Sequence, residues 1–339
     1  MPRSISKGTE KPERDILKLI PPPAAAPPRT SRRIGIHTST AGGVENAAER
    51  AYRLGCSTFQ IFSSSPRQWK PYGLSRPQCE TMSRLREKYD LHPLVIHANY
   101  LINVAGGNDE FHRKSIDALR AEMERGIALC ADYLVLHPGS FRGMDRKQGL
   151  ERAALAIERA ADSLHLAQAG LTLLIENTAG AEYSLGSSFE QVAELIQRLS
   201  AFIPVAACID TCHMHVAGYD IVKAAGYEQT MRHIDETVGL RNIPVWHCND
   251  AKAPRSSKLD RHEHIGKGSI GLEAFRALLN DERTQKAAFI AETPIDEPLD
   301  DLRNIDALKE LVIPDRSRMR KLEPRRIKGR KPSAEVRAH

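Results

Sequence analysis

The chain has 339 residues, of which 41% are hydrophobic and 27% are charged, and its formal net charge at pH 7 is +6. This length and composition suit one large globular domain or two smaller ones. No apolar run approaches the ~20 residues needed to cross a bilayer, and the N-terminus lacks the apolar stretch of a secretory signal. We therefore expect a cytoplasmic protein without a membrane partner, whose six scattered cysteines are reduced thiols.

The positive charge is concentrated at the two ends of the chain. Residues 1–33 hold eight Lys/Arg and three Asp/Glu, and residues 314–339 hold ten and three, which leaves residues 34–313 with a net charge of −6. The first end is rich in Pro and Ala and the last is basic, so both are predicted to be disordered extensions of a domain at 34–313. The basic tail suits either a solvated end or an arm that attracts polyanions.

Eight short apolar runs recur along the chain, each with the length and β-branched content of a buried strand. They are residues 33–37, 58–62, 93–97, 133–137, 171–176, 205–210, 244–248 and 287–292. Amphipathic stretches separate them, as in residues 42–55, where Val44, Ala47 and Leu54 fall on one helical face. This alternation predicts a closed parallel (β/α)8 TIM barrel. The alternative, an open doubly wound sheet, would more often carry a Gly-rich phosphate loop after its first strand.

Ionisable side chains end, or nearly end, seven of these eight strands. They are His37, His97, His137, Glu176, Asp210, His247 and Glu292. In a parallel barrel all strands point their C-terminal ends at the face where active sites lie, so these groups are expected to meet in one pocket. Carboxylates and imidazoles buried together need a counter-charge, which a divalent cation supplies. Imidazole and carboxylate ligands suit zinc, manganese or iron.

A further cluster follows the seventh strand, in the sequence LDRHEHIGKGSIG (259–271). Asp260 and His262 alternate there, so in an extended segment their side chains would face the same way. A pair of this kind on a loop also fits a solvated turn.

Several motifs, in order, resemble endonuclease IV, the zinc-dependent apurinic/apyrimidinic (AP) endonuclease family. They are HANYLIN, HPGS, IENTAG, IDTCH, VAGYD, HCNDAK and DRHEHIGKGSIG, and the resemblance runs from about residue 34 to residue 311. It implies a DNA-repair enzyme that hydrolyses the phosphodiester bond 5′ to an abasic site in double-stranded DNA, leaving a 3′-hydroxyl and a 5′-deoxyribose phosphate. It also implies a monomer that acts in the cytoplasm in association with the nucleoid.

The resemblance further implies a site for three zinc ions, with Mn²⁺ as an alternative at one position. The matching side chains are His97, His137 and Glu176 for the first ion; Glu176, Asp210, His247 and Glu292 for the second; and His213, Asp260 and His262 for the third. Glu176, which would bridge two ions, and Glu292 are expected to be catalytic. His37, His215 and His264 match no ligand of the family.

Two positions resemble residues that the family places against DNA: Arg67 in SPRQWKP and Tyr100 in HANYLIN. One departure is that HANY lacks the acidic residue often found after the histidine. Two other functions remain open from the residues alone: a metal-dependent sugar isomerase or epimerase on a TIM barrel, and a catalytically silent DNA-binding barrel. The isomerase would leave the pair at 260 and 262 unexplained, and the full set of ligands argues against a silent barrel.

Overall fold

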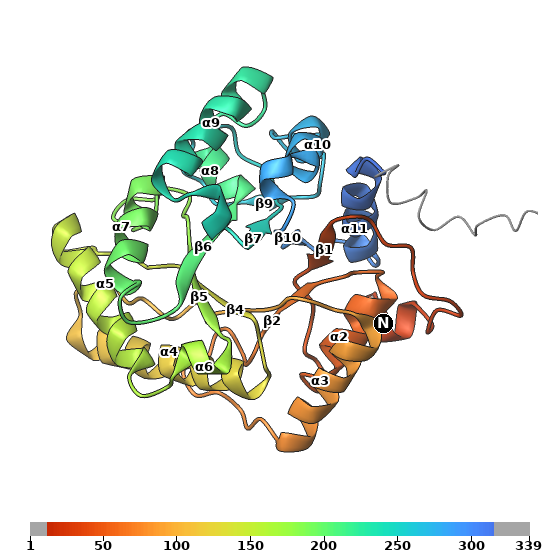
Figure 1. Cartoon of the computed structure of the whole chain (residues 1–339), viewed down its shortest axis with the longest axis horizontal. Helices are drawn as coiled ribbons and strands as arrows, with labels where there is room; N and C mark the ends of the chain where they lie inside the picture. Colours follow the sequence, from red (N-terminus) through yellow and green to blue (C-terminus); the bar gives the residue numbers. More distant parts are fainter. Residues whose placement is uncertain (1–11, 315–339) are drawn as a thin grey trace, which may run out of the picture.

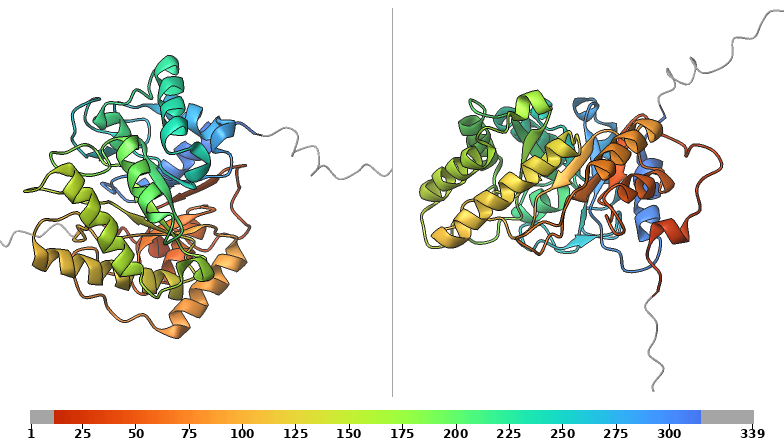
Figure 2. Two further views of the ribbon diagram at one scale, coloured as in Figure 1. Left: turned by 60° about the vertical axis from the view of Figure 1, so that its left-hand side comes forward. Right: turned by 90° about the horizontal axis from the view of Figure 1, so that it is seen from below.

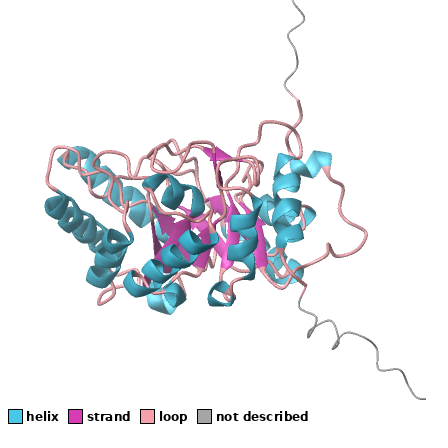
Figure 3. Ribbon diagram, turned by 90° about the horizontal axis from the view of Figure 1, so that it is seen from above, coloured by secondary structure: helices cyan, strands magenta, loops and turns pink. Residues whose placement is uncertain are grey.

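The computed structural model describes residues 12–314, and its centre is a parallel barrel of eight strands (Figures 1 and 3). The strands are β1 Arg33–Ile36, β2 Phe59–Phe62, β3 Leu94–His97, β4 Tyr133–Leu136, β5 Thr172–Glu176, β6 Val205–Asp210, β7 Val245–His247 and β10 Ala288–Ala291. Their order in the sheet is β1-β10-β7-β6-β5-β4-β3-β2, and every paired neighbour is parallel. The predicted TIM barrel is confirmed.

The barrel closes between β1 and β2, which meet at an isolated parallel bridge between His37 and Gln60. The backbone N–H of Thr38 donates to the carbonyl oxygen of Gln60 at 2.8 Å. Glycine is required at position 35, because a Cβ there would lie 1.9 Å from the carbonyl oxygen of Thr58, the residue just before β2. The missing side chain therefore allows the two strands to approach and complete the barrel.

Helices fill most connections and cover the outside of the barrel (Figure 2). They are α2 Asn46–Arg53, α3 Arg76–Tyr89, α4 Asp109–Ala128, α5 Arg146–Ala161, α6 Leu166–Ala169, α7 Phe189–Leu199, α8 Thr211–Ala217, α9 Ala224–Thr237, α10 Leu272–Asn280 and α11 Asp300–Leu311. Between β7 and α10, strands β8 (Asp250–Ala251) and β9 (His262–Glu263) form an antiparallel ribbon. Within residues 12–314, no helix is long and apolar enough to cross a membrane.

Residues 12–33 differ from the predicted disordered extension, because they pack against the barrel. A short helix, α1 (Ile16–Leu19), lies beside α2. From α2, the Arg50 guanidinium donates to Asp15 Oδ1 at 3.0 Å, and Arg53 donates to the carbonyl oxygen of Ile20 at 2.8 Å. The Pro/Ala content limits regular structure but leaves carbonyl groups free to accept from arginine side chains. The predicted disorder of residues 1–11 and 315–339 concerns parts of the chain outside the described residues.

Two stacked layers of side chains fill the upper part of the barrel. The lower layer is apolar and fully buried: Val95, Val135, Leu174, Cys208, Val245 and Ile290. Because side chains alternate along a strand, the residue two positions later faces inward as well. In these six strands it is His97, His137, Glu176, Asp210, His247 and Glu292. The fold thus places ionisable groups in one layer, directly above an apolar floor.

Candidate metal centre

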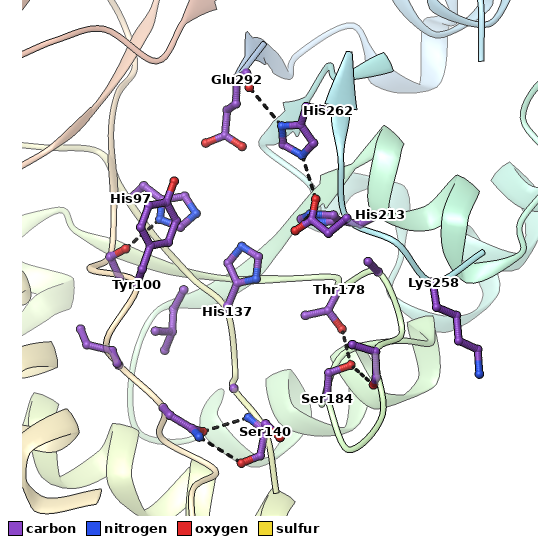
Figure 4. Close-up of a pocket in the computed structure, with 18 of the residues that line it drawn as sticks. His97, Tyr100, His137, Ser140, Thr178, Ser184, His213, Lys258, His262 and Glu292 are labelled. Carbon is purple, nitrogen blue, oxygen red and sulfur yellow. Dashed lines mark hydrogen bonds and ion pairs between the residues drawn. The ribbon is translucent and has the colours of Figure 1, made fainter. Parts of the chain in front are cut away.

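The upper layer opens into a cavity of about 730 Å³ at the carboxyl ends of the strands (Figure 4). The sequence-predicted residues that line it are His97, Tyr100, His137, His213, Asp260, His262 and Glu292. Glu176, Asp210 and His247 lie beneath them and are fully buried. All the predicted ligands therefore gather in or directly below a single cavity.

Glu176 lies at the centre of the first group. Its Oε2 atom is 2.9 Å from His137 Nε2 and 3.3 Å from His97 Nε2. This oxygen is buried, yet it accepts no well-directed hydrogen bond. His97 Nδ1 lies 2.8 Å from the carbonyl oxygen of Ala98, which assigns the ring proton to Nδ1 and leaves the Nε2 lone pair facing Glu176. Lone pairs that converge in this way suit a cation held between them.

The second group joins Glu176 to Asp210, His247 and Glu292. His247 Nδ1 lies 2.9 Å from Glu176 Oε1, 3.3 Å from Glu292 Oε2 and 4.0 Å from Asp210 Oδ2. Burial would raise the pKa values of Glu176 and Glu292, but the surrounding histidines hold both well below their usual range. Glu176 and Glu292 therefore remain ionised and concentrate negative charge around one imidazole.

The third group lies nearest the mouth of the cavity. His213 Nε2 is 3.2 Å from Asp260 Oδ2, and His262 Nε2 is 3.4 Å from Asp260 Oδ1. His262 Nδ1 faces the carbonyl oxygen of Glu292 at 3.0 Å, while its Nε2 is buried and has no hydrogen-bond partner. Asp260 thus lies between two imidazoles whose other nitrogens are already engaged, since His213 Nδ1 is 2.9 Å from the carbonyl oxygen of Asn177.

The electrostatics of this third group also favour a cation. Burial would lower the pKa of His213, but Asp210 and Asp260 raise it to about 10. Burial would raise the pKa of Asp260, but the hydrogen bond and charge of His213 lower it to about 2. With the side chains alone, a proton on His213 balances the carboxylates, and a divalent ion would provide the same compensation.

Asp210 and His213 link the second and third groups. Their positions are fixed by the end of β6 and the capped start of α8. Asp210 ends β6 and its Oδ1 accepts the N–H of His213 at 2.8 Å, which caps helix α8. His213 therefore turns back over the barrel mouth within the first turn of the helix. His215, on the same helix, is buried and contacts Ser269 at 3.1 Å, so the structure places it outside these groups.

Sequence reasoning missed three buried amides that fix the charged groups. Asn177 Oδ1 accepts the N–H of Asp210 at 2.6 Å, and Asn249 donates to Asp210 Oδ2 at 2.6 Å. Asn177 directly follows Glu176 in the motif IENTAG, and Asn249 lies two residues after His247 in the motif HCNDAK, which was the signal available. The third amide, Gln60, is the polar residue within the run TFQIF and contacts His37, His247 and Glu292.

Cysteines lie close to these groups but differ from the histidines in their environment. Cys208 belongs to the apolar floor, where burial raises the pKa of its thiol to about 12. Burial also raises the pKa of the Cys212 thiol, which donates to the carbonyl oxygen of Arg261 at 3.7 Å. Both thiols are therefore protonated near neutral pH, consistent with imidazoles and carboxylates as the available donors.

The two predicted DNA-contacting residues lie on neighbouring loops. Tyr100 is 64% exposed on the cavity wall, with its ring 5.0 Å from that of Phe62 and 5.8 Å from that of His97. Arg67 is exposed in the loop after β2 and does not line the cavity. Asn99 joins the two loops by donating to the carbonyl oxygen of Gln68 at 2.7 Å.

The chain resembles known proteins over most of its length. Residues 48–312 match the model of a family described as xylose isomerase-like TIM barrel. A protein of Solibacter usitatus named probable endonuclease 4 is 47% identical over 283 residues, which cover 83% of this chain and 97% of that protein. A Cenarchaeum symbiosum protein of the same name is 39% identical over 282 residues, which cover 83% of this chain and 99% of that protein.

Solved structures agree with these relatives. The crystal structure of endonuclease IV from Thermus thermophilus superimposes with a TM-score of 0.72 at 37% identity, covering 82% of this chain and 98% of that one. A D-tagatose 3-epimerase-like protein superimposes with a TM-score of 0.59 at 19% identity, covering 82% of this chain and 96% of that one. The epimerase shares the fold, whereas the endonuclease shares both fold and sequence.

Proposed function

We propose that this chain, which belongs to the endonuclease IV family of AP endonucleases, cleaves the phosphodiester bond 5′ to abasic sites by means of three zinc ions. The products would be a 3′-hydroxyl and a 5′-deoxyribose phosphate. The observation that carries this proposal is the gathering of three converging groups of imidazoles and carboxylates around one cavity.

The donor set supports zinc at each group. Every ligand that we propose is an imidazole nitrogen or a carboxylate oxygen, which suits zinc, with Mn²⁺ as an alternative at one position. Two buried atoms without hydrogen-bond partners, Glu176 Oε2 and His262 Nε2, face the places where ions would bind. Divalent ions bound there would lower the pKa of a coordinated water and polarise the phosphoryl group of the substrate.

The protein side chains have separable roles in this proposal. Glu176 presents Oε2 to His97 and His137 and Oε1 to His247, so its carboxylate is oriented to bridge two ions. Glu292 approaches the same ring nitrogen of His247, with Oε2 at 3.3 Å from Nδ1. Since these carboxylates stay ionised in a buried layer, they would fix the ions and exclude bulk water from below the phosphate.

Cations and an aromatic ring at the cavity rim support a nucleic-acid substrate. Lys258 and Arg261 line the cavity and could neutralise phosphates, while Tyr100 presents an exposed ring on another wall. An abasic nucleotide lacks its base, so extruding it costs less than extruding an intact one, and Arg67 and Tyr100 would fill the vacated stack. We propose that the enzyme acts as a monomer, because one chain supplies every ligand, and that it works in the cytoplasm at the nucleoid.

A duplex that contains one tetrahydrofuran abasic analogue tests the function directly. We expect the zinc-loaded protein to cut this strand once, on the 5′ side of the lesion, and to leave the undamaged duplex intact. Removal of zinc by a chelator should abolish cutting, and added zinc should restore it. Zinc-loaded protein that leaves the lesion strand uncut, or purified protein that takes up no zinc by elemental analysis, would contradict the proposal.

A further inference from the structure

Gln60 is a polar side chain at a position where the barrel is otherwise apolar. It lies on β2 and pairs in register with Val95 of β3, a member of the apolar floor. Its side chain is fully buried. Burying an amide without hydrogen-bond partners is destabilising, so a glutamine here needs compensating hydrogen bonds.

The amide of Gln60 is engaged on both of its ends. Its Nε2 donates to Glu292 Oε1 at 2.5 Å and lies 3.0 Å from His37 Nδ1. Its Oε1 lies 2.8 Å from His247 Nε2. The side chain thus connects two of the proposed zinc ligands, Glu292 and His247, from below the cavity.

These contacts fix which way the amide points. As a zinc ligand Glu292 would be a carboxylate, which only accepts hydrogen bonds, and its Oε1 lies beside Nε2 of Gln60, so it faces the NH₂ group. The amide oxygen then faces His247, and the ring nitrogen opposite that oxygen, Nε2, must carry the proton. The lone pair of His247 is consequently on Nδ1, the nitrogen that faces Glu176 and Asp210.

We infer that Gln60 is a positioning residue, which holds His247 in the Nε2–H tautomer and orients Glu292 so that both present lone pairs to the same ion. This inference rests on the proposed zinc site and adds to it a residue that contacts no ion. His37 supports the arrangement by accepting the second amide hydrogen through Nδ1. Hydrogen-bonded partners of this kind fix ligand orientation in metal sites, and their loss costs about 10- to 100-fold in metal affinity.

The test compares Gln60→Met with wild type. Methionine has a similar length and fills the same space, but it offers none of the three hydrogen bonds. We expect zinc affinity, measured by competition with a chromophoric chelator, to fall about 10- to 100-fold. Ile290→Val is the matched control, because it shrinks the same floor beneath Glu292 while leaving the contacts of Gln60 intact, and it should bind zinc as wild type does.

A spectroscopic measurement on the unaltered holoenzyme covers the case in which Gln60→Met fails to fold. Nitrogen-15 correlation spectra of the zinc-loaded wild type should show the His247 proton on Nε2. A proton on Nδ1, or a folded Gln60→Met variant with unchanged zinc affinity, would overturn the inference. Either result leaves the proposed function standing, whereas a wild-type protein that takes up no zinc would refute the proposed function itself.

Discussion

His213 and Asp260 meet at the mouth of the barrel, with Nε2 of the imidazole 3.2 Å from Oδ2 of the carboxylate. One comes from the first turn of α8 and the other from the loop that leads into β9. Either a proton on His213 or a cation bound between the two side chains compensates the charge of Asp260. The proposed partner is the third zinc ion, which His262 would complete.

Replacing His213 by alanine tests this partner. We expect His213→Ala to reduce bound zinc from about three ions to two per chain, because one of three ligands is lost. His215→Ala is the control, since His215 is equally buried two residues away but contacts Ser269. Elemental analysis of the purified variants decides, and the opposite pattern, with zinc lost only from His215→Ala, would refute the assignment.

The carboxylate of Glu176 should matter most for turnover. Glu176→Gln keeps the shape of the side chain but replaces one ligand oxygen with an amide, so we expect cleavage of an abasic duplex to slow by several orders of magnitude. Glu122→Gln is the matched control: Glu122 is also a buried carboxylate, but it accepts a hydrogen bond from Ser63 and belongs to none of the three groups. Single-turnover rates at saturating enzyme make the comparison, and equal rates for the two variants would contradict the role of Glu176.

The buried carboxyl group of Asp301 is expected to make the stability of the protein depend on pH. It is buried on α11, Oδ1 has no hydrogen-bond partner, and burial with the neighbouring Asp300 raises its pKa to about 6. Since the folded-state pKa lies above the unfolded value, the stability contributed by this carboxyl is lost as the pH rises from about 4 to about 6. Asp301→Asn should therefore be more stable than wild type at pH 8, by about 3 kcal/mol, and equal to it below pH 4.

Asp300→Asn is the control for this prediction, and its expected effect on stability has the opposite sign. Asp300 accepts hydrogen bonds from the N–H groups of Asp296 and Glu297, and its pKa is lowered. Its removal should destabilise the protein at pH 8. Urea unfolding at the two pH values measures both variants, and an Asp301→Asn variant less stable than wild type at pH 8 would contradict the cause given for Asp301.

The basic tail offers a prediction about DNA affinity that the sequence alone supports. If residues 314–339 contact phosphates, each neutralised phosphate adds about 0.9 to the slope of log affinity against log salt. Deleting the tail should flatten that slope on any duplex while the rate at saturating substrate persists, because the proposed ligands lie in the barrel. An unchanged slope would make the tail a solvated end, and a lost rate would mean that the site extends beyond the barrel.

Much of the fold and of the candidate site could be predicted because strand periodicity is simple. An apolar run that ends in His97, Glu176 or Asp210 also places that side chain inward, two residues above the floor. The amides Asn177, Asn249 and Gln60 could not be assigned in this way. Their hydrogen-bond partners come from other strands or loops. The neighbouring sequence does not distinguish a buried glutamine that orients a histidine from a buried glutamine without such a role.

The N-terminal segment shows a second limit of sequence reasoning. Proline and alanine at residues 21–28 correctly argue against long helices or strands there. They carry no information about arginines elsewhere, yet Arg50 and Arg53 of α2 bind the segment through Asp15 and the carbonyl oxygen of Ile20. A segment can therefore be irregular in backbone and still be held in place by cations that a different element provides.

The apolar floor of Val95, Val135, Leu174, Cys208, Val245 and Ile290 makes the candidate site a blind-ended well. Ions, water and substrate can then enter and leave through the mouth alone. A duplex bound over that mouth would block this route, and ions bound beneath it would exchange with solvent only after the DNA dissociates. In the presence of a zinc chelator, the retention of zinc by the DNA-bound enzyme would then depend on the lifetime of the complex with DNA more than on the affinity of individual ligands.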